Sequence, residues 1–161
     1  MTDVVTADDL ARLAGRIGAA AELLSIEMQD LSFSTVPREI TTYPIPIALS
    51  VNLIIEHSRI PPETVGYRVK AQIDGHLSDG KPLFHLEASY VAAFILRGPD
   101  FTEGELDAFG NVSVVQMVFP YLRELTASVS SRSGLPPLTL PAFRVPIGAT
   151  QSEPVAAPSA P

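Results

Sequence analysis

Residues 118–124 read VFPYLRE, and residues 132–141 read RSGLPPLTLP. Pro120 stands inside an apolar pattern of helical period, although proline lacks an N–H group and costs a helix interior about 3 kcal/mol. Gly134 and the prolines behind it form a helix stop, because glycine adopts the left-handed conformation and proline cannot continue a helix. The two segments therefore predict a long helix that ends near Gly134 and an extended, proline-rich exit.

The predicted helix carries more apolar surface than one contact face requires. One stripe consists of Val115, Val118, Leu122, Leu125 and Val129, and Val114, Met117 and Tyr121 extend it around a second side. A surface helix needs one stripe only, so the second indicates burial between two layers. Upstream, Thr102 and Glu105 form a capping box for a short helix, which is expected to end at Gly110 with Asn111 capping the main helix.

Four segments before these helices alternate apolar and polar residues with the period of a β-strand. They cover residues 24–33, 45–55, 65–76 and 83–96. The first changes parity near Gln29-Asp30, which predicts a bulge or a switch of faces. Asp79-Gly80 predicts a type I′ hairpin between the last two segments, and the prolines of residues 36–46 mark a connection. The pattern is typical of an antiparallel sheet with one buried face.

Thr6 and Asp9, followed by Leu10, Leu13 and Ile17, predict a further helix over residues 7–20. We therefore predict an α+β fold in which a four-stranded antiparallel sheet packs on a long helix, with an added N-terminal helix. The expected units are a helical arm at residues 1–22, the domain at 23–146 and a disordered Pro/Ala-rich tail at 147–161.

The composition limits the class of partner. The chain has 161 residues, a formal charge of −7 and no cysteine. A net acidic chain is a poor ligand for nucleic acid, and without thiols there is no disulfide framework or thiolate metal site. We find no signal peptide and no apolar window of about 20 residues, so a soluble, cytoplasmic protein is expected.

Residues that could carry out catalysis are scattered. His57, His76 and His85 lie on separate strands or strand ends without metal-ligand spacing, although His76 and His85 could face each other across the hairpin. No nucleophile elbow or phosphate-binding glycine loop is present. We therefore expect neither an enzyme nor a cofactor or metal.

Apolar area exceeds what a thin two-layer domain can bury, since Val91, Ala93 and Ile95 make the fourth strand apolar on both faces. Such an excess marks an interface or a groove for apolar ligands. The predicted ligand-binding residues lie in the proline-rich connection and the exit: Val36, Tyr43, Ile45, Ile47, Leu138, Leu140 and Phe143. The alternative is that they form ordinary core and subunit contacts.

The chain resembles the SecB family of bacterial export chaperones from about Glu27 to Phe143. Besides VFPYLRE and the proline-rich exit, the resemblance rests on QDLSF at residues 29–33, FHLE at 84–87 and AAF at 92–94. It implies a cytosolic dimer of dimers with the main helix between two sheets, and hence Phe119, Tyr121 and Leu122 at the interface. It also implies that the acids Asp30 and Glu87 dock the export motor SecA; the alternative is that they are ordinary solvated side chains.

Three departures from SecB are present: Ser34 where the family has a further acid, the added N-terminal helix, and a tail without an amphipathic helix. In its N-terminal helix and its tail, the chain is similar to the actinobacterial SecB-like chaperones of toxin–antitoxin systems. The resemblance implies an ATP-independent holdase for unfolded polypeptides, with exported precursors or an antitoxin as clients. The alternative is a hot-dog-like carrier or enzyme for small apolar ligands, in which Asn111 would be the candidate site residue.

Overall fold

The computed structural model describes residues 6–36, 46–98 and 100–142. The elements follow in the order α1 (Ala7–Gly18), β1 (Ala21–Thr35), β2 (Ile47–Ile60), β3 (Thr64–Leu77), β4 (Pro82–Leu96), α2 (Glu103–Phe109), the π-helical segment η1 (Gly110–Val114) and α3 (Val115–Arg132). The predicted α+β fold is confirmed, including the N-terminal helix and the long helix that contains Pro120.

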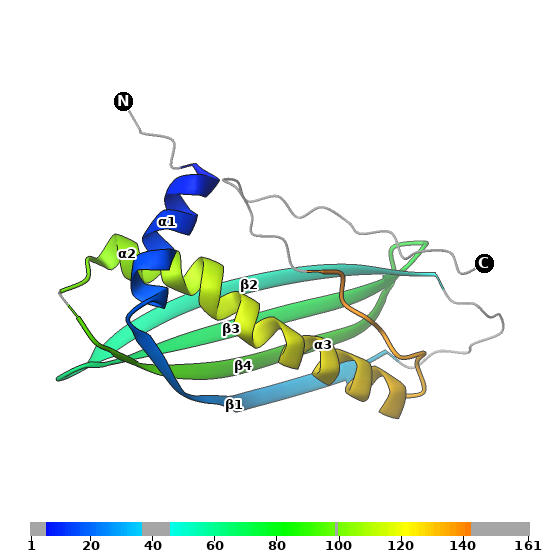
Figure 1. The fold of residues 1–161 in the computed structure, drawn as a ribbon. Coiled ribbons are helices and arrows are strands. Elements are labelled where there is room, and N and C mark those ends of the chain that lie inside the picture. The colour runs from blue at the N-terminus through cyan, green and yellow to red at the C-terminus, as the bar shows by residue number, and fades with distance from the viewer. Residues whose placement is uncertain (1–5, 37–45, 99, 143–161) are drawn as a thin grey trace.

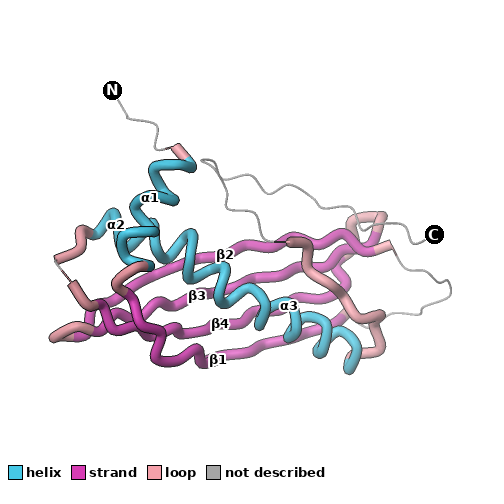
Figure 2. The backbone as a smooth tube through the Cα atoms, viewed as in Figure 1, coloured by secondary structure: helices cyan, strands magenta, loops and turns pink. Residues whose placement is uncertain are grey.

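The four strands form one antiparallel sheet in the order β1-β4-β3-β2 (Figure 2). In β3, alternate residues from Val65 to Ile73 are buried, as the period of two predicts. The ladder between β1 and β4 shifts register twice, between Leu23 and Ser25 and between Met28 and Asp30. The second shift confirms the bulge predicted from the change of parity in this strand.

The hairpin between β3 and β4 is not the predicted type I′ turn. Only Gly80 has a positive φ, +82°, whereas a type I′ turn requires it at Asp79 as well. Gly80 N donates to Leu77 O at 2.9 Å, and Leu77 N donates to Lys81 O at 2.9 Å. The loop is therefore a three-residue turn that ends in a left-handed glycine. The Asp79 carboxylate accepts from Lys81 N at 3.1 Å and stabilises this shape.

The helices cover one face of the sheet (Figure 1). The segment η1 lies against β2, and α3 lies against β3 and β4, so the helical layer crosses the strands obliquely. The N-terminal helix α1 packs on α2, where Ile17 is fully buried and Arg16 forms an ion pair with the buried carboxylate of Glu105. Edge strand β1 receives no comparable cover from α3.

The prediction that a helix ends at Gly110 is wrong. Gly110 has φ −58° and ψ −53°, and the chain stays helical from α2 through η1 into α3. A Cβ atom at Gly110 would lie 2.9 Å from Tyr67 Cε1 and 3.1 Å from Ile55 Cγ2. The glycine therefore allows helix and sheet to approach closely. Asn111 does not cap α3, because its amide donates to Asp107 O at 2.9 Å within the continuous helix.

We expect Gly110→Ala to lower the free energy of unfolding by about 1–3 kcal/mol, because its methyl group would press on a buried ring that cannot retreat. Gly104→Ala is the matched control, since a Cβ there meets nothing within 4 Å and alanine favours the helix by about 0.5–1 kcal/mol. Urea unfolding of both variants measures the difference. Equal free energies of unfolding of the two variants would show that a methyl group at position 110 is accommodated without loss of stability.

Candidate functional site

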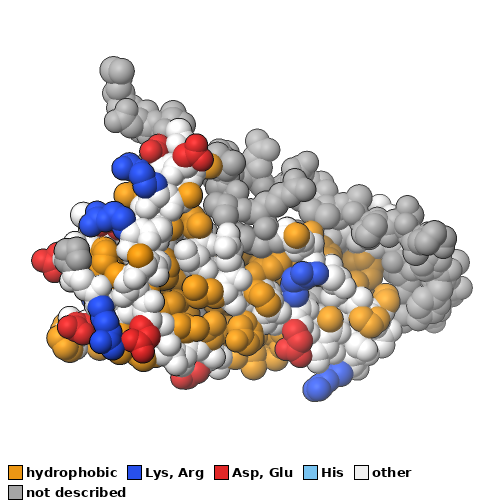
Figure 3. Space-filling view, in the orientation of Figure 1, with side chains coloured by type: hydrophobic (Ala, Val, Ile, Leu, Met, Phe, Trp, Pro, Cys, Tyr) orange, Lys and Arg blue, Asp and Glu red, His pale blue; other side chains and the backbone are white. Residues whose placement is uncertain are grey.

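The structure leaves an apolar surface open where α3 stops short of β1. We call it the β1–α3 apolar face. Its members are Leu23, Met28 and Leu31 on β1 and Met117 and Tyr121 on α3, with exposed fractions of 45%, 49%, 43%, 39% and 47%. Figure 3 shows apolar side chains gathered along this part of the molecule.

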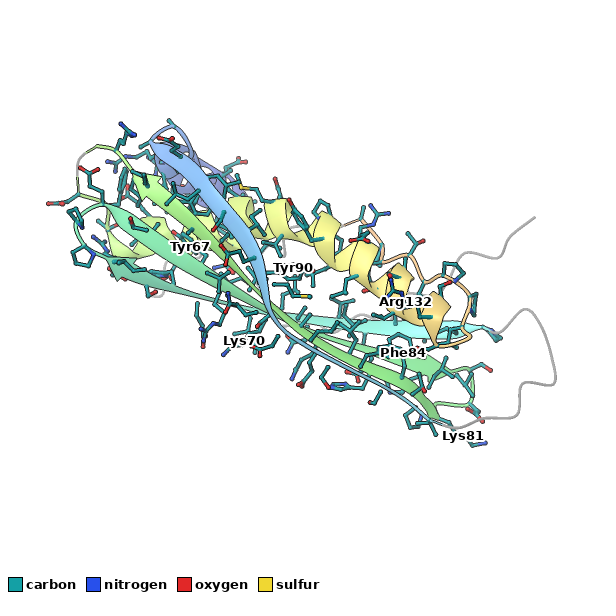
Figure 4. The ribbon with its side chains drawn as sticks, turned by 90° about the horizontal axis from the view of Figure 1, so that it is seen from below. Tyr67, Lys70, Lys81, Phe84, Tyr90 and Arg132 are labelled. Atoms are coloured by element: carbon teal, nitrogen blue, oxygen red, sulfur yellow. The ribbon has the colours of Figure 1, made fainter. Side chains whose placement is uncertain are left out.

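One aromatic contact makes this surface continuous. The rings of Tyr121 and Tyr90 have centroids 6.1 Å apart, and Tyr90 stands opposite Met28 in the register of β4 and β1. Figure 4 shows Tyr90 between the sheet and α3. Tyr90 itself is buried, and burial raises the pKa of its hydroxyl. It therefore forms an apolar floor that joins the exposed side chains of the helix to those of the strand.

The predicted ligand-binding residues fall into three groups. Val36, at the end of β1, is 46% exposed, and Leu138 is half-buried. Ile47 and Leu140 are buried in the core of the chain itself. The last group lies outside the described residues: Tyr43, Ile45 and Phe143. Of the predicted residues that the structure describes, Val36 and Leu138 are thus the two that an external polypeptide can reach without rearrangement.

The predicted interface residues differ in their exposure. Phe119 and Leu122 are 6% and 1% exposed in the single chain, whereas Tyr121 is 47% exposed. A second chain can contact Tyr121 directly, but Leu122 already belongs to the core between helix and sheet. Sequence reasoning did not select Met28 and Leu31, because residues of the buried parity of a strand are expected to be covered. The signal that could have found them is β1's position at the edge of the sheet.

Asp30 and Glu87 lie together on the opposite face of the sheet, which we call the outer face. Both line a cavity of about 430 Å³ that also includes Arg68 and Lys70, and Figure 4 shows Lys70 pointing away from the helices. Asp30 accepts a hydrogen bond from Ser89 Oγ at 3.0 Å. The cavity therefore combines acidic and basic groups.

His85 lies beside this cavity and joins two carboxylates. Its Nδ1 is 2.6 Å from Asp74 Oδ1, and its Nε2 is 3.2 Å from Glu87 Oε1. The hydrogen bond to Asp74, and then that to Glu87, raise the pKa of His85. The hydrogen bond from Gln72, and then that from His85, lower the pKa of Glu87. The suggested pairing of His85 with His76 is not formed, because His76 stands opposite Pro82.

His57 has a structural position under α2. Its Nε2 is 2.9 Å from Glu103 Oε2 and its Nδ1 is 3.2 Å from Asp107 Oδ1, while its ring packs on Tyr67 at 5.7 Å. These contacts hold α2 against β2. Within residues 6–36, 46–98 and 100–142, no group of three or more His, Asp or Glu side chains is arranged to hold a metal ion.

A sheet that carries helices on one face, an open apolar strip beside them and a charged outer face is suited to binding polypeptides. The family model described as preprotein translocase subunit SecB matches residues 18–144. The chain therefore belongs to the SecB family, whose members are chaperones. Most of α1 precedes the matched region.

Individual relatives agree with this family. The protein-export protein SecB of Paramagnetospirillum magneticum is 28% identical over 141 residues, which are 87% of this chain and 85% of the relative. The SecB of a Ruegeria species is 38% identical over 61 residues, which are 38% of this chain and 36% of the relative.

A solved structure shares the fold. It is the Mycobacterium tuberculosis Rv1957 SecB-like chaperone in complex with a ChAD peptide from the Rv1956 HigA1 antitoxin. The TM-score is 0.75 at 20% identity, with 84% of this chain and 99% of that chain covered. No helix in the described part of this chain is long and apolar enough to cross a membrane.

The His85 cluster predicts a pH-dependent part of the stability. A histidine whose pKa is raised by folding stabilises the fold fully below its unfolded pKa of about 6.5, and this contribution is lost as the pH rises through the folded value. The stability of the unmodified protein relative to His85→Gln should therefore be greater at about pH 6 than at about pH 9. Urea unfolding at both values measures this. A constant difference would contradict the coupling.

Proposed function

We propose that this chain is an ATP-independent holdase that binds unfolded polypeptides and prevents their aggregation. The observation that carries the proposal is the β1–α3 apolar face, which stays exposed although the core beside it is closely packed. A holdase works by mass action: it binds the unfolded chain and lowers the concentration of the free, aggregating form. This requires exposed apolar surface and no chemical step.

In this proposal the β1–α3 apolar face and the exposed residues Val36 and Leu138 have two roles. Met117 and Tyr121 on α3 contact a second pair of subunits, which gives a homotetramer built as a dimer of dimers. Leu31 and Val36 on the rim of β1, with Leu138 of the exit, remain for the client. The side chains of all three residues are at least partly exposed. An extended client segment can bury alternate apolar side chains there.

The clients are exported precursors, an antitoxin, or both. Membership of the SecB family supports precursors. An antitoxin is supported by the fold shared with a SecB-like chaperone that binds an antitoxin peptide. An adjacent toxin–antitoxin gene pair would favour the specialised role. Both roles place the protein in the cytoplasm, where these clients are made.

The outer face is proposed to dock SecA through Asp30 and Glu87. Their shared cavity supports a joint role, because a basic segment could contact both carboxylates at once. Arg68 and Lys70 line the same cavity, although Lys70 is paired with Glu56 at 3.0 Å. Rim charges of this kind mainly steer association, so the interaction should weaken with salt.

A hot-dog-like carrier or enzyme is less well supported. That alternative requires Asn111 to face a ligand at the start of the main helix. Asn111 is instead exposed, with its amide bonded to the carbonyl of Asp107 in the same helix. We therefore propose a non-enzymatic role without a cofactor.

The double variant Leu31→Ser, Val36→Ser tests client binding. Truncating anchor side chains costs about 1–2 kcal/mol, so the concentration for half-suppression of aggregation of a denatured protein should rise about fivefold or more. Ile54→Ser with Ile60→Ser is the matched control, because these apolar side chains are 44% and 56% exposed and Ile54 lies on the outer face. If the unmodified protein does not suppress aggregation at stoichiometric amounts, the holdase function itself is refuted.

Tyr121→Glu tests the assembly. A charge at this position would be buried without a partner between the subunits, so light scattering should show dimers in place of tetramers. Ser58→Glu, at an exposed position of β2, should leave the mass unchanged. A monomeric mass for the unmodified protein would refute the proposed tetramer. Leu122→Glu is unsuitable here, because it would disrupt the core of each chain.

A further inference from the structure

The outer face carries a hydrogen-bonded row of side chains that runs through His85 to Asp74. Glu87 Oε1 accepts from Gln72 Nε2 at 3.0 Å and lies 3.2 Å from His85 Nε2. Asn52 Nδ2 donates to Gln72 Oε1 at 3.4 Å. On the other side of the ring, His85 Nδ1 is 2.6 Å from Asp74. The row therefore extends from β2 through β3 to β4 and includes one of the two acids proposed to dock a partner.

The ring of His85 can satisfy both neighbours only when it is protonated. A neutral imidazole has a single N–H donor, whereas the imidazolium has two, and ionised carboxylates accept only. Both ring nitrogens of His85 face a carboxylate. The hydrogen bond to Asp74, and then that to Glu87, raise the pKa of His85, because both carboxylates favour the protonated ring.

Few other charged groups face His85. Directly opposite in the sheet are Asp74 on β3 and the uncharged Ser34 on β1. The remaining charged or titratable groups of this part of the outer face have other positions or partners: Asp30 bonds to Ser89, Lys70 to Glu56, Lys81 to Asp79, and His76 stands opposite Pro82, while Arg68 lines the far part of the cavity. The charge of the Asp74–Glu87 pair is therefore set mainly by His85.

Protonation of His85 has two effects on Glu87. It adds one positive charge beside the carboxylate, which lowers the negative potential of the cavity that Glu87 shares with Asp30. It also donates a hydrogen bond to a Glu87 oxygen, so that this oxygen is less available to accept one from a basic partner. Both effects weaken the binding of a basic segment, so they act in the same direction.

We propose that His85 makes the outer face a pH-dependent recognition surface: it binds a lysine- or arginine-rich polypeptide segment weakly when His85 is protonated and more tightly when His85 is neutral. The proposal rests on the docking role of Asp30 and Glu87 given above. It adds the residue that regulates that surface and the direction of the response. The surface requires no conformational change, because a single proton alters both the charge and the available acceptor.

The experiment measures binding of purified SecA to the full-length protein by calorimetry, at about pH 6 and pH 8.5 in low salt. The affinity of the unmodified protein should be about two- to fivefold higher at the higher pH, the range expected for one partly exposed charge. His85→Gln should bind with one affinity, near the high value, at both pH values, after correction for titration within SecA. His76→Gln is the matched control and should behave as the unmodified protein does.

A second variant tests the mechanism by another route. Asp74→Asn removes the first partner of His85, so the midpoint of the pH response should move to lower pH, and NMR titration of the His85 ring should show the same displacement. An unchanged pH response in His85→Gln, with SecA binding intact, would overturn this inference alone. Absence of SecA binding by the unmodified protein at both pH values would overturn the docking role and the regulation with it.

Discussion

The close contact between the start of the helical layer and strand β3 is the constraint on which the rest of the structure depends. Tyr67 packs edge-on against Phe94 and Phe109, with ring centroids 5.9 and 5.7 Å apart, and its hydroxyl donates to Leu106 O at 3.1 Å. Gly110 permits this approach because it has no side chain. The buried hydroxyl is satisfied and burial raises its pKa, so the contact is both apolar and hydrogen-bonded. It fixes where the helical layer starts over the sheet.

From that fixed point the helix can cover only part of the sheet. It starts over β2 and crosses β3 and β4, which leaves the helix-side surface of β1 open. The exposed Met28 and Leu31 are therefore a geometric consequence of the oblique crossing. An exposed apolar surface of this kind marks an interface with a second subunit or with a bound polypeptide. The proposed assembly and the proposed client binding thus use the same incompletely covered surface.

The outer face follows a different principle. Around Asp30, Glu87 and His85 its side chains are polar, hydrogen-bonded and at least partly exposed, so they contribute little to stability and can be used for recognition. The row of His85 and the row of Asp30 lie on either side of the row that contains Glu87. The two faces of one thin sheet are consequently available for separate partners, one apolar and one charged.

Local patterns were sufficient to predict the elements of this fold. The alternation in β3, the parity change near Asp30 and the capping box at Thr102 are all present as predicted, because each depends on neighbours within a few residues. The prediction that Gly110 ends a helix was wrong, since in isolation a glycine signals a stop, and only the ring of Tyr67 on a distant strand explains its role here.

The placement of functional side chains required the tertiary structure. Sequence periodicity identified Leu122 and Tyr121 as apolar helix residues but could not tell that one is buried in its own chain and the other is exposed. Likewise, it placed His85 and Glu87 on the polar side of a strand without showing that Asp74 completes the cluster. Secondary structure follows from short-range preferences, whereas exposure and side-chain pairing depend on the crossing of the helix and the register between strands.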